Sequence, residues 1–178
     1  MKGENGWQEE RGTSFLECLT ALPLLAIVFT AFALLLTSVT KDIICLLADW
    51  ELQQEICLVT QRLERCLASA DKVEFYGNGG QTISIRCREP GNPQRERWYT
   101  YTVKQSTYLP ARVTENTQPL TGDSSLGQTE ITAFDCHYDG KGVFAIRVAG
   151  KSRVSKHDFA LETACLVTDE VRDFYEKQ

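Results

Sequence analysis

Histidine is scarce in this sequence, which holds two, His137 and His157, among 178 residues. Histidine is the commonest general base and a frequent metal ligand, so few active sites can be built from this composition. No nucleophile elbow and no cysteine–histidine protease signature is present either. Cys136 and His137 are neighbours in an expected strand, where successive side chains point to opposite faces, so they should not share a metal. We therefore expect no enzyme activity, no metal site and no cofactor.

A net positive charge is also missing. The chain has 24 Asp and Glu residues against 19 Lys and Arg residues, which gives a net charge of -5. This balance argues against a nucleic-acid-binding surface spread over the whole chain. One local basic stretch runs from Lys141 to Lys156, and a solvated strand-and-loop face is its simplest interpretation. A DNA or secreted-protein partner is left open but has no support in the sequence.

Charge is absent altogether from residues 18–39, an apolar run of about 22 residues. As a helix, such a run is long enough to cross about 30 Å of hydrocarbon. A secretory signal peptide would have an apolar core of only about 7–15 residues and a small-residue cleavage site after it. Here LLLTSVTKD (34–42) follows, and the leader before the run is not clearly positive. We expect a membrane-spanning helix, for which a plain signal anchor is one interpretation.

Glu17 places a carboxylate at the start of this apolar run, and neither a signal peptide nor a plain anchor explains it. An acidic group at the bilayer centre costs about 2.5–3.5 kcal/mol, less near the interface, so such a carboxylate usually has a partner. If the chain were cut between Gly12 and Thr13, a new ammonium would appear four residues before Glu17. It could pair with Glu17 of its own chain, one helical turn away, or with that of a neighbouring subunit. The second pairing favours side-by-side assembly of helices in a set stagger.

The stretch RGTSFLECLTALPLLAIVF (11–29) resembles the N-terminal signature of type IV prepilins and pseudopilins. In that family a hydrophilic leader ends in glycine, and four residues separate it from a glutamate that begins an apolar helix. The resemblance implies that Gly12 precedes the scissile bond, that Thr13 is the first mature residue and is N-methylated, and that Glu17 serves subunit assembly. It also implies a prepilin peptidase, other pilins or pseudopilins, an inner-membrane assembly platform and membrane lipid as partners. The departures from the family pattern are a threonine at the first mature position, an acidic leader and Pro23 within the helix.

Glycine and proline are absent from residues 41–70, so one helix is expected from about Thr13 to Ala70. Apolar residues recur there at spacings of three and four: Leu52, Ile56, Val59, Leu63, Cys66 and Ala70. This amphipathic pattern predicts that the second half of the helix packs one face on a soluble domain.

After Asp71 the pattern changes to short strands and turns. Strands are expected at VEFY (73–76), QTISIRCR (81–88), RWYTYTV (97–103), TEITAFDCHY (129–138), GVFAIRV (142–148) and KHDFALETACLVT (156–168), with a weaker one at TYLPARVT (107–114). Turns or loops are expected at 77–80, 89–96, 118–127 and 139–142, and a short helix in the polar tail 169–178. The predicted fold class is α+β and pilin-like: a long N-terminal helix packed on a mostly antiparallel β-sheet. WYTYTV (98–103), LPAR (109–112) and QPLTG (118–122) are similar to segments of the J-type minor pseudopilins.

The seven cysteines are an odd number. Cys57 and Cys66 are nine residues apart on one expected helix, about 13 Å of rise, which is too far for a disulfide. A pair such as Cys87 with Cys136 is one option if the soluble part lies outside the cytoplasm. Buried free thiols are the other option.

Four segments are expected along the chain. They are a cleaved leader (1–12), a transmembrane and assembly helix (13–40), its amphipathic continuation (41–70) and a soluble β-rich domain (71–178). The functional hypothesis is a minor pilin-like structural subunit of a type IV pilus or a type II secretion pseudopilus, serving secretion, adhesion, motility or competence. Its N-terminus would be cytoplasmic and its C-terminal domain would lie outside the inner membrane.

The alternative hypothesis is a single-pass membrane anchor that presents a binding domain, for a ligand or for DNA during uptake, and that is neither cleaved nor assembled. An anchor has no need of the spacing between Gly12 and Glu17. This spacing therefore favours the pilin-like hypothesis.

Overall fold

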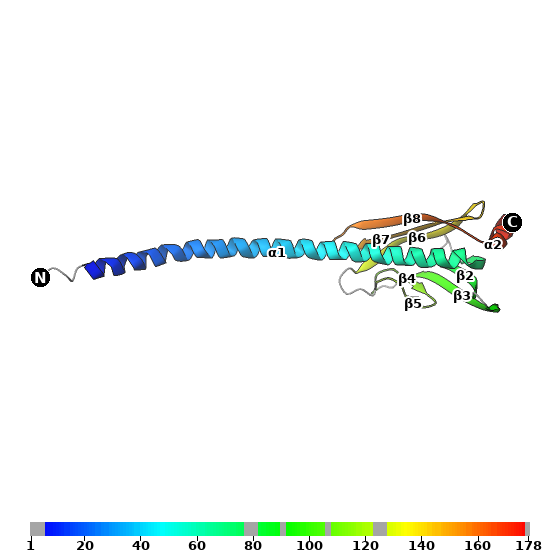
Figure 1. Ribbon diagram of the computed structural model, residues 1–178, viewed down its shortest axis with the longest axis horizontal. Coiled ribbons are helices and arrows are strands. Elements are labelled where there is room, and N and C mark those ends of the chain that lie inside the picture. The colour runs from blue at the N-terminus through cyan, green and yellow to red at the C-terminus, as the bar shows by residue number, and fades with distance from the viewer. Residues whose placement is uncertain (1–5, 77–81, 90–91, 106–107, 123–127, 177–178) are drawn as a thin grey trace. The chain divides into compact units, whose positions relative to one another are not determined.

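The chain divides into two compact units, Met1–Ile43 and Ile44–Gln178. The computed structural model describes residues 6–76, 82–89, 92–105, 108–122 and 128–176 (Figure 1). The turn expected at 77–80 and residues 123–127 of the loop expected at 118–127 lie outside the described residues.

One long helix, α1 (Gly6–Ala68), runs from the first unit into the second. Its residues after Pro23 contain no glycine and no further proline, so nothing in the sequence interrupts the backbone ladder. It ends two residues before the expected Ala70. There Ser69 closes the last turn, since its backbone N–H donates to the Cys66 carbonyl at 3.3 Å and its hydroxyl to the Arg65 carbonyl at 3.0 Å.

The strands of the second unit form two antiparallel sheets, where a single sheet was expected. The first sheet has the order β1-β2-β3-β4-β5: β1 (Ala70–Tyr76), β2 (Thr82–Glu89), β3 (Asn92–Lys104), β4 (Arg112–Glu115) and β5 (Gln118–Pro119). The second has the order β6-β7-β8: β6 (Thr129–Gly140), β7 (Val143–Ser152) and β8 (Asp158–Leu166). A short helix, α2 (Asp169–Glu176), follows, as expected for the polar tail.

The weak strand expected at 107–114 shortens to β4, which begins at Arg112. Pro110 precedes it and has no N–H to give to a ladder. The loop expected from residue 118 begins instead with the two-residue strand β5, which pairs with β4. The loop expected at 89–96 is wrong from Asn92 onward, because β3 begins there and pairs with the end of β2, while residues 90–91 lie outside the described residues. The hairpin expected at 139–142 is confirmed, because it joins β6 to β7. Its turn places Gly140, Lys141 and Gly142 at φ of 91°, 55° and 76°, a region that glycine enters without strain.

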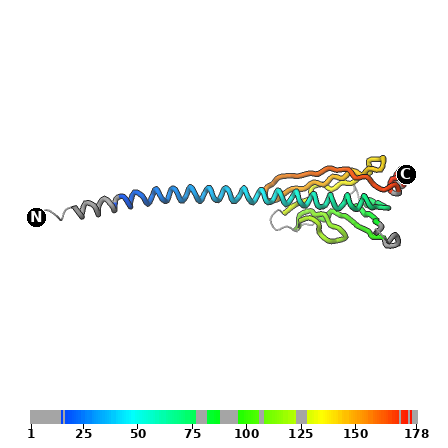
Figure 2. The backbone as a smooth tube through the Cα atoms, viewed as in Figure 1, coloured from blue at the N-terminus to red at the C-terminus, as the bar shows by residue number. Residues whose placement is uncertain are grey.

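The last part of α1 packs against residues of both sheets (Figure 1 and Figure 2). Its apolar stripe is fully enclosed, with each side chain at most 1% exposed: Leu52, Ile56, Val59, Leu63 and Leu67. Gly150 of β7 lies directly beneath it, because a Cβ added there would be 3.1 Å from Leu52 Cδ1. A long N-terminal helix packed against antiparallel sheets is thus confirmed, and the fold class is α+β.

Polar contacts flank this stripe and connect α1 to both sheets. Arg62 donates to the Glu115 carboxylate of β4 at 2.6 Å, and Thr163 of β8 donates to Glu64 at 2.8 Å. The backbone N–H of Gly122 donates to the Glu55 carboxylate at 3.1 Å. These bonds set the rotation of the helix, because each satisfies a polar group just outside the apolar contact.

Candidate functional site

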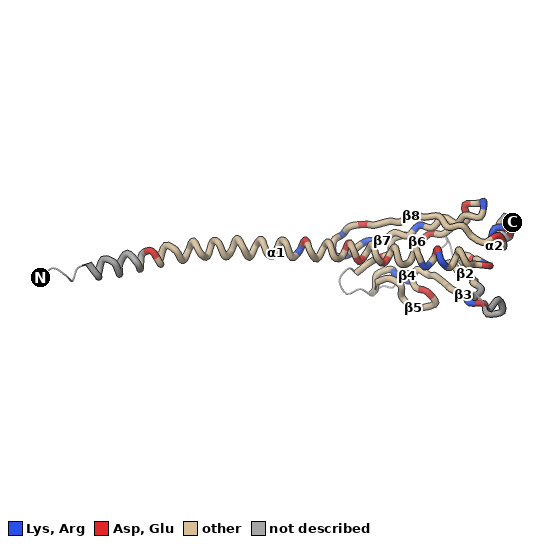
Figure 3. The backbone as a smooth tube through the Cα atoms, in the orientation of Figure 1, with Lys and Arg blue, Asp and Glu red and all other residues tan. Residues whose placement is uncertain are grey.

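The side chains of α1 between Cys18 and Ile44 are almost all exposed to the surroundings. The large apolar ones are 39–68% exposed: Leu19, Leu22, Leu24, Leu25, Ile27, Val28, Phe29, Phe32, Leu34, Leu35, Leu36, Val39, Ile43 and Ile44. Figure 3 shows no charge on this helix from Cys18 until Lys41 and Asp42. An apolar surface of this extent on a soluble monomer would be unfavourable in water, so it needs lipid or other helices against it.

The threonine hydroxyl groups on this surface are satisfied within the helix. Thr30, Thr37 and Thr40 each donate to the carbonyl four residues earlier at 2.7 Å, and Thr20 donates to the Glu17 carbonyl at 3.0 Å. Such bonds remove the need for water, which the bilayer core does not supply. Among the described residues, one helix is long and apolar enough to cross a membrane, and it is α1.

The predicted assembly residues lie on the same helix. Gly12 and Thr13 belong to α1 by their backbone, while their side chains are outside the described ones. Glu17 is exposed and has no ion-pair partner among the described side chains. The four-residue separation of Thr13 and Glu17 is one helical turn, so an amine at Thr13 would lie on the same side of the helix as the carboxylate.

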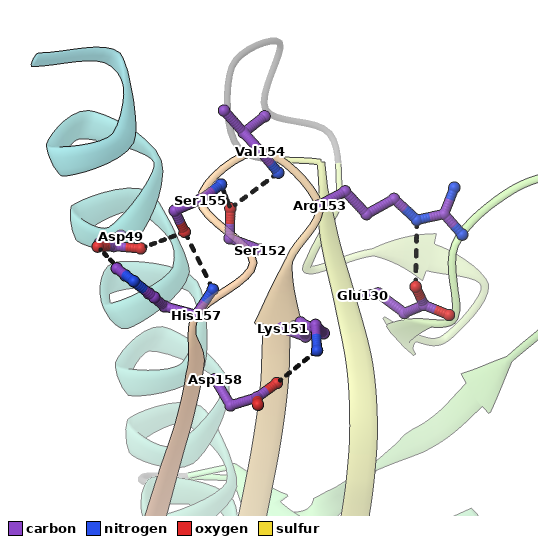
Figure 4. A network of polar contacts seen from close by, with 9 residues as sticks. All are labelled: Asp49, Glu130, Lys151, Ser152, Arg153, Val154, Ser155, His157 and Asp158. Carbon is purple, nitrogen blue, oxygen red and sulfur yellow. Dashed lines mark hydrogen bonds and ion pairs between the residues drawn. The ribbon is translucent and has the colours of Figure 1, made fainter. Parts of the chain in front are cut away.

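A second polar group, which the sequence did not indicate, connects α1 to the turn between β7 and β8 (Figure 4). Asp49 of α1 accepts a hydrogen bond from the Ser155 hydroxyl through Oδ1, and its Oδ2 lies 2.8 Å from His157 Nδ1. The buried Ser152 organises the turn by accepting from the backbone N–H groups of Val154 at 3.3 Å and Ser155 at 3.2 Å. The hydrogen bonds from Ser155 and His157 hold the pKa of the Asp49 carboxyl below its ordinary value.

Serine, histidine and aspartate meet in this group, yet their order differs from that of a hydrolytic triad. In a triad the histidine lies between the other two and removes the serine proton. Here Asp49 lies in the middle, and the Ser155 hydroxyl donates to it rather than to the imidazole. The arrangement therefore holds a turn against a helix and gives Ser155 no base.

The basic stretch at 141–156 is largely neutralised by acids on neighbouring strands. Ion pairs join Arg147 to Glu162 at 3.1 Å, Lys151 to Asp158 at 3.7 Å and Arg153 to Glu130 at 3.1 Å, the last two drawn in Figure 4. These pairs are exposed, so each contributes at most about 1 kcal/mol to stability. Because of these ion pairs, little concentrated positive charge is left to bind the phosphate backbone of a nucleic acid.

The other histidine, His137, does not share a site with the neighbouring thiol of Cys136. His137 of β6 is exposed beside Asp135 at 3.4 Å, whereas Cys136 points into the core at 2% exposure, as strand alternation predicts. Burial raises the pKa of the Cys136 thiol to about 12. In the part of the chain that the structure describes, no three His, Cys, Asp or Glu side chains gather closely enough to hold a metal ion.

All seven cysteines carry free thiols, and the pair considered from the sequence, Cys87 with Cys136, is divided between the two sheets. The Cys87 thiol instead donates to the Cys66 carbonyl at the end of α1, at 3.3 Å. Sequence spacing could not reveal this approach, because it depends on how β2 folds back against β1 and the helix end.

The chain was compared with protein-family models, curated proteins and solved structures. No family model matches it, and neither a curated protein nor a solved structure does.

Proposed function

We propose that this chain is a minor pilin-like structural subunit of a type IV pilus or a type II secretion pseudopilus, assembled through its N-terminal helix. One observation carries the proposal: the glycine–glutamate spacing at 12–17 directly precedes the charge-free stretch 18–39 of α1, whose large apolar side chains are exposed. A membrane anchor needs the apolar surface but not the glycine and the glutamate before it.

The proposed processing creates the charge that Glu17 requires. A prepilin peptidase cuts between Gly12 and Thr13, which removes the acidic leader and leaves a Thr13 amine, then N-methylated. The Glu17 carboxylate of one subunit pairs with the Thr13 amine of an adjacent subunit. Because each charge is costly in an apolar surrounding without the other, pairing between chains sets the stagger of packed helices.

The second unit fits the role of a domain presented by such a helix. Its core is built around α1, with five leucine, isoleucine and valine side chains of the helix buried against residues of both sheets. The resemblance of three of its segments to J-type minor pseudopilins supports a minor subunit. Other pilins or pseudopilins, the peptidase and an inner-membrane assembly platform are the proposed partners, and the second unit lies outside the cytoplasm.

The carboxylate can be tested with a substitution that removes charge and keeps shape. Glu17→Gln is compared in the native host with Asp42→Asn, a matched change farther along the exposed part of the same helix. An unpaired charge at membrane depth costs about 2.5 kcal/mol or more, and 1.4 kcal/mol corresponds to a factor of ten. We therefore expect Glu17→Gln to reduce the chain in sheared filaments more than about tenfold. Asp42→Asn should leave it unchanged.

Immunoblotting of sheared and membrane fractions provides the measurement. Glu17→Gln protein that enters filaments as well as the original chain would contradict the assembly role of the carboxylate. If the original chain itself stays in the membrane with its leader intact, the single-pass anchor with a binding domain is the better description.

A further inference from the structure

The end of α1 and the last part of β2 bring two cysteines close together. Cys66 lies in the last turn of the helix, and β1 begins four residues later at Ala70. Ala70 is the register partner of Cys87 on β2, so β2 returns the chain to the helix end. The Cys87 thiol donates to the Cys66 carbonyl oxygen at 3.3 Å, which places the Cys87 sulfur against the backbone of the residue that carries the second thiol.

The two thiols differ in their surroundings. Cys87 is 7% exposed, whereas Cys66 is half-buried and its Sγ lies 3.2 Å from the Tyr101 hydroxyl. The nearby Cys87 thiol, helped by the Tyr101 hydroxyl, lowers the pKa of Cys66, and the same closeness raises the pKa of Cys87. Cys66 is therefore the more nucleophilic and more accessible member of the pair.

Spacing excludes a disulfide between Cys136 and Cys165 and one within α1. Cys136 and Cys165 lie on β6 and β8 with β7 between them, which separates their backbones by about 10 Å. A disulfide needs Cα atoms within about 7 Å. Cys18, Cys45 and Cys57 lie along α1, and at 1.5 Å of rise per residue the nearest two, Cys45 and Cys57, are about 18 Å apart.

We propose that Cys66 and Cys87 are joined by a disulfide in the mature protein. The oxidant is a carrier protein with a reactive disulfide, in the compartment that holds the second unit. The bond links the end of α1 to β2 and closes residues 66–87 into a loop. It goes beyond the proposed assembly role and does not depend on processing at Gly12.

The oxidation is a thiol–disulfide exchange in two steps. The Cys66 thiolate attacks one sulfur of the carrier disulfide, which breaks that bond and leaves a mixed disulfide and one carrier thiolate. The Cys87 thiolate then attacks the Cys66 sulfur, forms the Cys66–Cys87 bond and releases the second carrier sulfur. The two protons lost by the cysteines pass to the carrier, which leaves as a dithiol, so two electrons move from the protein to the carrier.

The full chain provides the test without any substitution. Reduced protein in detergent micelles is incubated with a purified protein-disulfide oxidant, quenched with acid, unfolded and treated with maleimide before and after reduction. In the oxidised sample that is labelled without reduction, we expect two fewer maleimide adducts than the seven cysteines allow. Proteolysis should give one crosslinked species that contains residues 66–72 and Cys87.

Two variants assign the bond. Cys57→Ser replaces another half-buried thiol of the same helix, and it should keep the crosslink. Cys66→Ser should lose the crosslink and expose Cys87 to maleimide. Full labelling of the original chain after oxidation, or a crosslink between other cysteines, overturns the proposal. Neither result bears on cleavage after Gly12, so this inference and the assembly role fail separately.

Discussion

The packing of α1 in the second unit makes a quantitative prediction for Leu63→Ala. Leu63 lies in the middle of the buried stripe and is 0% exposed. The substitution removes three carbon atoms, worth about 2.5 kcal/mol at about 0.8 kcal/mol each. The cavity left between helix and sheets adds about 1 kcal/mol, and the better helix propensity of alanine returns only about 0.2 kcal/mol. We expect the free energy of unfolding to fall by about 3 kcal/mol.

The matched control is Leu58→Ala, the same change on the same helix at a side chain that is 44% exposed. It should lower the free energy of unfolding by less than about 1 kcal/mol, because little apolar area leaves the core. Both variants are compared in urea by far-ultraviolet circular dichroism, using the unit of residues 44–178 expressed by itself. Equal losses for the two leucines would refute the burial of this stripe against the sheets.

Two further predictions concern the contacts of α1 with the second sheet. Gly150→Ala places a Cβ 3.2 Å from the Glu130 carbonyl of the paired strand and 3.1 Å from Leu52 Cδ1. A backbone carbonyl does not move aside, so the strain should outweigh the entropy gained and lower the unfolding free energy by about 1 kcal/mol in the same urea titration. Asp49→Asn should cost about 1 kcal/mol at neutral pH, because charge-assisted bonds to Ser155 and His157 are weakened at a partly exposed site. Since the pKa of Asp49 is lowered on folding, this stabilisation is present above its ordinary pKa of 3.8 and disappears as the pH falls through the lower value. The stability difference between Asp49→Asn and the original chain should therefore shrink below about pH 4, and a difference unchanged down to about pH 2 would contradict the role of the charge.

Sequence reasoning succeeds here where the signal is local. The periodicity that includes Leu52, Ile56 and Leu63 predicted both the helix and its buried face. The glycine-rich turn at 139–142 predicted the β6–β7 hairpin. Both patterns are short-range consequences of backbone preference and hydrophobic spacing.

The parts that sequence did not predict depend on contacts between distant segments. Division of the strands into two sheets requires knowing which strands pair, and alternation within one strand does not contain that information. Asp49 meets Ser155 and His157 across 106 and 108 residues. Cys66 meets Cys87 only because β1 and β2 fold back against the helix end.

The candidate assembly residues combine a local sequence signal with a contact that a single chain does not contain. The spacing of Gly12, Thr13 and Glu17 is visible in the sequence, and the structure places all three in α1 at the front of the exposed apolar surface. The proposed partner of Glu17 is an amine on a second chain. A single chain therefore supplies only one half of that pair.

The most direct test of the pilin-like account is the mature N-terminus, read by mass spectrometry of the full chain produced with and without a prepilin peptidase. The account predicts a chain that begins at Thr13 with a methylated amine when the peptidase is present, and one that retains the leader when it is absent. A chain that keeps residues 1–12 in both samples would contradict it, and Glu17 would then belong to an uncleaved membrane anchor.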